Sequence, residues 1–100
     1  MYWFTWATPA FGGVLGSCHA LDIPFAFDNL SAPGTDMLTG DGAERAGIAE
    51  RFADEIVQFA KSSAPTWPAF DFADRSTLEI NADMNVLTDP EGEIRSLFVN

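Results

Sequence analysis

The one histidine of the chain, His19, stands in a run of residues that could carry proton-transfer chemistry. Ser17 and Cys18 come directly before it, and Asp22 follows three positions later. Histidine suits a general base because its unperturbed pKa of ~6.5 leaves both protonation states accessible near pH 7. His19 is therefore the first candidate for a catalytic residue.

The neighbours of His19 make poor partners for a complete catalytic site. The nucleophilic serine of many hydrolases lies in a G-x-S-x-G turn, but Leu15 stands where the first glycine would precede Ser17. Adjacent side chains usually point in different directions, so Cys18 is a poor thiol nucleophile for His19. We expect Asp22 to cap the short helix that follows it rather than to act as a catalytic acid.

The segment before His19 predicts a buried strand followed by a glycine-rich loop. The aromatic run Tyr2–Trp6 does not alternate apolar with polar residues, which is typical of strands buried on both faces of an α/β sheet. Three glycines between positions 12 and 16 then break regular structure. The sequence thus places His19 on a tight loop after a buried strand.

The clearest helix is expected over Asp41–Lys61. Asp41 is expected to be its N-cap, with Glu44 completing a capping box, and Lys61 suits the negative end of the helix dipole. One apolar stripe repeats at helical spacing and indicates the buried face. Its members are Ala49, Phe52, Ala53, Ile56 and Ala60.

The remaining expected elements are short. A helix over Asp22–Asn29 tolerates a proline in its first turn, and Ser31–Asp36 has loop composition. Thr77–Asn81 alternates as a strand does, and Val86–Asp89 is expected to return as a second short strand. A helical turn is expected over Glu93–Phe98.

Composition argues against several classes of partner. The chain has 100 residues, a formal net charge of −10 and only five scattered basic residues, whereas nucleic acids and anionic membranes select clustered lysine and arginine. No apolar run reaches the ~18 residues of a membrane-spanning helix. Cys18 is the one cysteine, so no internal disulfide is expected, and no ligand pattern calls for a metal or a cofactor. A lone cysteine slightly favours the cytoplasm without assigning a compartment.

The distribution of aromatic residues predicts an uncovered surface. Seven of the 13 aromatic residues lie within the first 27 positions, yet only one long helix is available to cover the strand they form. Large exposed apolar patches usually mark an interface. Two interpretations follow. One is a stand-alone α+β module that dimerises through its N-terminal aromatic face, with His19 as a relic or a packing residue; the other is a piece of a larger protein.

Several motifs in order resemble the C-terminal part of the type-B carboxylesterases, which are α/β-hydrolases. The motifs are the histidine run Gly16–Phe27, the amphipathic helix Ala49–Ala60, the Trp-Pro segment Trp67–Asp71, the strand Leu78–Ile80 and the turn Asp89–Glu93. The resemblance covers most of the chain. It implies that residues 1–100 form a single, incomplete C-terminal segment of such a domain: a buried strand, a histidine loop, a long helix and a short β-hairpin.

The same resemblance implies a function for His19. It corresponds to the general base of a Ser-His-acid triad that hydrolyses carboxylic esters. In that family the nucleophile and the acid lie upstream of this segment, so the isolated chain is expected to be inactive. The implied partners are a small ester substrate and the missing N-terminal region, and no cofactor is implied.

Overall fold

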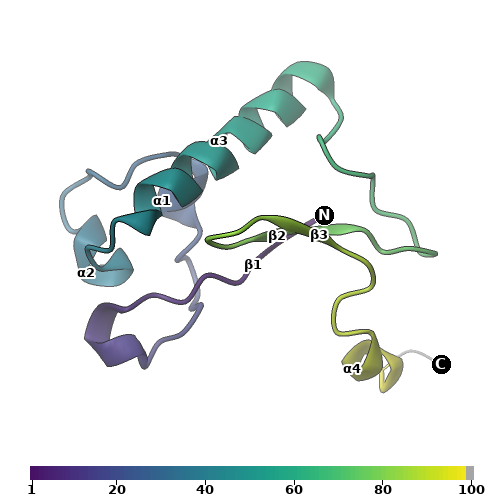
Figure 1. Ribbon diagram of the computed structural model, residues 1–100, viewed down its shortest axis with the longest axis horizontal. Coiled ribbons are helices and arrows are strands. Elements are labelled where there is room, and N and C mark those ends of the chain that lie inside the picture. Colours follow the sequence, from purple (N-terminus) through teal and green to yellow (C-terminus); the bar gives the residue numbers. More distant parts are fainter. Residues whose placement is uncertain (99–100) are drawn as a thin grey trace.

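A computed structural model of the protein describes residues 1–98, which form a small mixed α+β unit (Figure 1). A three-stranded sheet carries helices on one of its faces. The elements in chain order are β1 (Tyr2–Phe4), the 3-10 helix η1 (Ala10–Gly13), α1 (Ile23–Ala26), α2 (Thr35–Thr39), α3 (Glu44–Ser62), β2 (Thr77–Ile80), β3 (Asn85–Leu87) and α4 (Gly92–Ser96).

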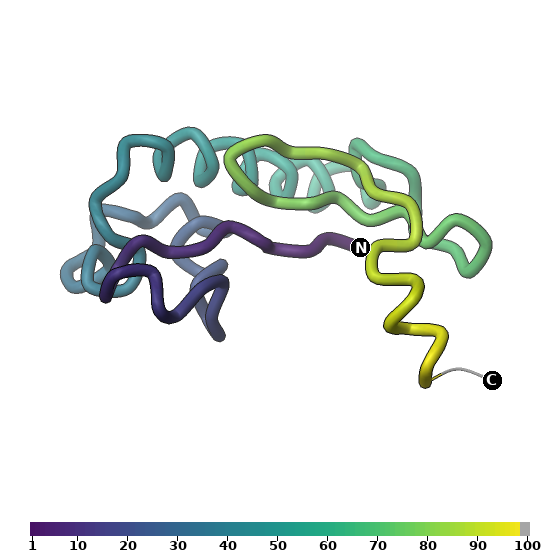
Figure 2. Tube along the Cα trace, turned by 60° about the horizontal axis from the view of Figure 1, so that its bottom comes forward, coloured from purple at the N-terminus to yellow at the C-terminus, as the bar shows by residue number. Residues whose placement is uncertain are grey.

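The sheet has the order β1-β2-β3, with β1 at one edge. Strand β1 runs parallel to β2, pairing Tyr2 with Leu78, and β3 returns antiparallel, pairing Val86 with Leu78. Parallel strands need a long crossover, and here the crossover carries the helices α1 to α3. Figure 2 shows β1 in purple beside the green β2–β3 hairpin, with the yellow α4 leaving the sheet.

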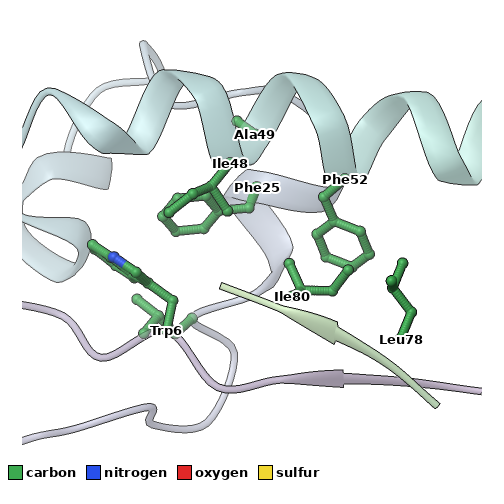
Figure 3. Packing of buried hydrophobic residues seen from close by; sticks show 8 residues of the cluster. Trp6, Phe25, Ile48, Ala49, Phe52, Leu78 and Ile80 are labelled. Carbon is green, nitrogen blue, oxygen red and sulfur yellow. The ribbon is translucent and has the colours of Figure 1, made fainter. Parts of the chain in front are cut away.

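The core lies between α3, α1 and the sheet (Figure 3). Phe25 of α1, Ile48 of α3 and Ile80 of β2 are fully buried, and Phe52 is 1% exposed. The ring centroids of Trp6 and Phe25 lie 5.0 Å apart. Positions 48 and 49 lie four and three residues before position 52, so all three fall on one face of α3, which turns toward the strands.

The expected apolar stripe of the long helix is right in its first half and wrong in its second. Ala49 and Phe52 are buried, but Ile56 is 40% exposed and Ala60 is exposed. The reason is visible in Figure 1, where α3 diverges from the sheet toward its C-terminal end. The outer half of the helix therefore presents apolar side chains that residues 1–98 cover only in part.

The start of the long helix corrects a second expectation. The helix begins at Glu44 rather than at Asp41, Ala43 stands at the N-cap position, and no side chain caps the first turn. The Arg45 side chain donates from its Nε to the carbonyl of Gly42 at 3.0 Å, which is a bond to a carbonyl and therefore not a cap of the first-turn N–H groups. The expectation of a capping box at Asp41 is therefore wrong, although the helix itself is confirmed.

The short elements are confirmed in part. The strand expected over Thr77–Asn81 is β2, its partner β3 begins one residue earlier than expected, and α1 and α4 are shorter than their predicted ranges. The segment Ser31–Asp36 was expected to be loop, but α2 begins within it at Thr35. A tertiary contact supports this helix, since the buried Thr8 hydroxyl donates to the carbonyl of Leu38 at 2.6 Å.

Strand β1 is not buried on both faces, contrary to the expectation from its composition. Side chains alternate along a strand, so Tyr2 and Phe4 face α3, where their rings lie 5.0 and 6.1 Å from that of Phe52. Trp3 points to the other face and is 39% exposed, and Tyr2 is itself 46% exposed on the α3 face. One face of β1 thus lacks cover within residues 1–98, as the aromatic distribution predicted.

Over the same residues, no helix combines the length and the apolar character needed to span a membrane.

Candidate active site

His19 lies exposed on the loop between η1 and α1, beside strand β1. This loop and the strand border an open hollow of about 310 Å³. The residues that line it are Tyr2, Trp3, Phe4, Ser17, Cys18, His19, Ala20 and Asp22. The structure therefore brings His19 together with each of the neighbours that the sequence placed beside it.

Backbone contacts hold the loop on both sides of His19. The carbonyl of Gly16 accepts a hydrogen bond from the N–H of Thr8 at 3.1 Å. The N–H of the fully buried Leu21 donates to the carbonyl of Cys18 at 3.3 Å. Between them Ala20 has a φ of +65°, a left-handed conformation that alanine rarely adopts. The turn places His19 at the surface while its neighbours reach the core.

The serine and the cysteine of the loop have other contacts. The Ser17 hydroxyl donates to the backbone carbonyl of Phe4 at 3.0 Å. Cys18 is half-buried and packs against the hydrophobic core. These contacts tie the loop to the sheet and the core.

The expectation that Asp22 caps the next helix is wrong. Asp22 precedes α1, but its backbone is already helical, with φ −69° and ψ −24°, and its side chain makes no cap. The left-handed turn at Ala20 brings the chain into a helical conformation early, so the carboxylate points elsewhere. It accepts a hydrogen bond from the Tyr2 hydroxyl at 3.3 Å. Burial, and then the charge and hydrogen bond of Asp22, raise the pKa of Tyr2.

A second hollow of about 430 Å³ adjoins the loop and shares Ala20 with the first. Sequence reasoning did not find it, because α1, α2 and the segment between them build it together. The remaining residues that line it are Ile23, Pro24, Phe27, Asn29, Pro33, Gly34, Thr35 and Leu38.

The described residues place a histidine at the hollow but no complete triad around it. Within the described range 1–98, no carboxylate hydrogen-bonds to His19, and no cluster of three or more His, Cys, Asp or Glu residues is placed to hold a metal ion. An exposed imidazole on an anchored loop can accept and return a proton. A nucleophile and an orienting acid would have to come from other polypeptide.

Comparison with known proteins assigns the chain to a class. The chain belongs to the carboxylesterases of the α/β-hydrolase fold, as a segment of such an enzyme. It is 34% identical over 93 aligned positions to the para-nitrobenzyl esterase of Bacillus subtilis strain 168, a match that covers 77% of this chain and 17% of that esterase. No protein-family model matches the sequence.

Solved structures agree with this relationship. A PNB esterase structure superimposes with a TM-score of 0.84 at 27% identity, covering 100% of this chain and 21% of that one. A carboxylesterase of Geobacillus stearothermophilus gives a TM-score of 0.80 at 32% identity, covering 99% and 21%. The chain thus spans about one fifth of the length of these relatives. The resemblance drawn from the sequence motifs is confirmed, and the interpretation as an independent dimerising module is not favoured.

Proposed function

We propose that residues 1–100 are the C-terminal segment of a carboxylesterase and that His19 is the general base of its Ser-His-acid triad. The longer protein hydrolyses small carboxylic esters. The serine, the acid and most of the substrate pocket come from the rest of the polypeptide, so this segment alone is inactive.

The observation that carries the proposal is the position of His19 relative to the sheet. His19 is exposed in a hollow beside β1, on the loop that follows the carboxyl end of this strand. Strand β1 pairs parallel with β2. In sheets of this kind ligands bind outside the carboxyl ends of the strands. A histidine in that position, in a chain related to esterases, supports a catalytic role over a packing role.

The chemistry asked of His19 is two proton transfers. Its imidazole takes the proton of the serine hydroxyl as that oxygen attacks the ester carbonyl. It then gives the proton to the departing alcohol, and the same cycle repeats when water releases the acyl group. The acid of the triad orients the imidazole through its other ring nitrogen.

The uncovered surfaces of the segment support a larger folded partner. Strand β1 is an edge strand of the described sheet, and its Tyr2 and Trp3 are 46% and 39% exposed. On the outer half of α3, Val57 and Phe59 are 45% and 54% exposed. Apolar surface of this extent favours packing against further protein, which we propose is the remainder of the same hydrolase.

A segment exchange tests the proposal. The chain would replace the matching segment of the Bacillus subtilis esterase, and hydrolysis of p-nitrophenyl acetate would be followed. We expect an active chimaera in which His19→Ala lowers kcat/KM by about 10³-fold, within the range for a lost general base, at an unchanged melting temperature. Ser31→Ala, an exposed loop change outside the His19 hollow, is the control. Full activity after His19→Ala would refute the assignment.

A further inference from the structure

The backbone of β1 leaves one of its carbonyls directed away from the sheet. The carbonyl of Met1 accepts from Leu78 at 3.1 Å, and the N–H of Thr5 donates to Ile80 at 3.0 Å. Since strand residues alternate in the direction of their N–H and C=O groups, odd-numbered residues bond to β2. The carbonyl of Phe4 therefore faces the open edge of β1.

Ser17 occupies that edge position. Its hydroxyl donates to the Phe4 carbonyl at 3.0 Å, which joins the end of β1 to a point two residues before His19. The bond satisfies a backbone group that the described sheet does not pair. It also fixes the incoming side of the histidine loop against a strand that is itself hydrogen-bonded to β2.

A second bond joins β1 to the outgoing side of the loop. The Tyr2 hydroxyl donates to Oδ2 of Asp22, three residues after His19, at 3.3 Å. The Tyr2 ring is held in place, because it packs edge-on against the buried Phe52 with centroids 5.0 Å apart and an interplanar angle of 66°. A tyrosine hydroxyl has an ordinary pKa of about 10 and so stays protonated, and a donor, through the neutral pH range. Burial and the neighbouring Asp22 raise the pKa of Tyr2 further.

We propose that Ser17 and the Tyr2–Asp22 pair are positioning residues, which clamp the His19 loop to β1 on both sides and present the imidazole in one place. The inference rests on the proposed function of His19. None of the three side chains needs to touch the reacting atoms. Their effect is geometric, because a proton acceptor displaced by a fraction of an ångström loses the alignment on which catalysis depends.

The clamp is separable from the fold of the loop. The Thr8–Gly16 bond and the burial of Leu21 hold the backbone at its ends, so loss of the clamp leaves the segment folded and loosens only the residues between. Its signature is a fall in kcat with little change in KM or melting temperature. A residue that merely stabilised the fold would lower the melting temperature instead.

The kinetic test uses the same chimaeric esterase. We expect Ser17→Ala and Tyr2→Phe each to lower kcat about 3- to 10-fold, and the double variant by more than either, at constant KM. Ser17→Thr, which keeps a hydroxyl, restores most of the rate, and Ser31→Ala has no effect. An unchanged kcat in the double variant, or a change confined to KM, overturns the proposal.

The structural test uses the isolated chain and does not depend on activity. Backbone ¹⁵N relaxation of residues 18–20 should give order parameters near the ~0.85 of rigid backbone, falling toward ~0.6 in the Ser17→Ala/Tyr2→Phe variant. Unchanged order parameters overturn the clamp even if His19→Ala abolishes catalysis. Order parameters that fall in the isolated chain, together with a chimaera whose activity is indifferent to His19→Ala, instead reject the proposed function and keep the clamp, so the two failures are distinguishable.

Discussion

Arg95 binds the carboxylate of Asp89 through two parallel hydrogen bonds, Nε to Oδ1 at 3.0 Å and Nη2 to Oδ2 at 2.9 Å. Arg75 approaches the same carboxylate at 3.6 Å, with its guanidinium 5.3 Å from the ring centre of Phe72. This two-pronged geometry fixes direction as well as distance. It attaches α4 to the segment that follows β3, at the opposite end of the molecule from η1 (Figure 1).

This ion pair predicts a loss of stability in acid. The hydrogen bond from Arg95, with the charges of both arginines, lowers the pKa of Asp89. A lowered folded-state pKa gives a contribution that is present above the unfolded value of about 3.9 and is lost as the pH falls through the folded value. We expect Asp89→Asn to flatten the melting temperature of the chain between about pH 4 and pH 2. If the melting temperature of the Asp89→Asn variant fell with pH as steeply as that of the unchanged chain, the Asp89 ion pair would not be the source of the acid sensitivity.

The two halves of α3 predict opposite sensitivities to the same substitution. Phe52 is 1% exposed and Phe59 is 54% exposed on one helix. Phe52→Ala should cost about 3–5 kcal/mol of unfolding free energy, because it leaves a cavity in the core. Phe59→Ala should change the unfolding free energy by about 0.5 kcal/mol or less in the isolated chain. Urea denaturation measures both, and equal losses would show that α3 does not pack as described.

Alanine substitutions at two glycines should change the free energy of unfolding in opposite directions. Gly40 has a φ of +71°, and a Cβ there would lie 2.9 Å from Cγ of Pro9, whereas a Cβ on Gly47 within α3 would meet nothing within 4 Å. Gly40→Ala should destabilise the chain by about 1–3 kcal/mol through backbone strain. Gly47→Ala should stabilise it by about 0.5–1 kcal/mol, because alanine favours the helix. Thermal melts of the two variants check the pair, and a stabilising Gly40→Ala would contradict the turn.

Local periodicity of apolar residues predicted those elements in which a single packing neighbour decides the buried face. The alternation in Thr77–Asn81 gave β2, and the spacing of Ala49 and Phe52 gave the buried face of α3. The same rule failed at Ile56 because α3 diverges from the sheet toward its C-terminal end (Figure 1). Sequence pattern specifies which face is apolar, but the extent of the covering surface depends on other parts of the fold.

The contacts around the candidate site could not be predicted in the same way. The motif run identified His19, but the bond between Tyr2 and Asp22 joins residues 20 positions apart. It forms because Ala20 adopts a left-handed turn, which no residue type at that position signals. Helix α2 was missed for a related reason, since a distant threonine hydroxyl at Thr8 supports its Leu38 carbonyl.

The role of His19 as general base is tested by the rate of serine acylation in the chimaeric esterase, with and without the imidazole of His19. The burst of p-nitrophenol from p-nitrophenyl acetate should slow by about 10³-fold in His19→Ala and recover in part when free imidazole is added. A burst of unchanged rate in a folded His19→Ala protein would contradict the account and leave His19 as a surface residue of the loop.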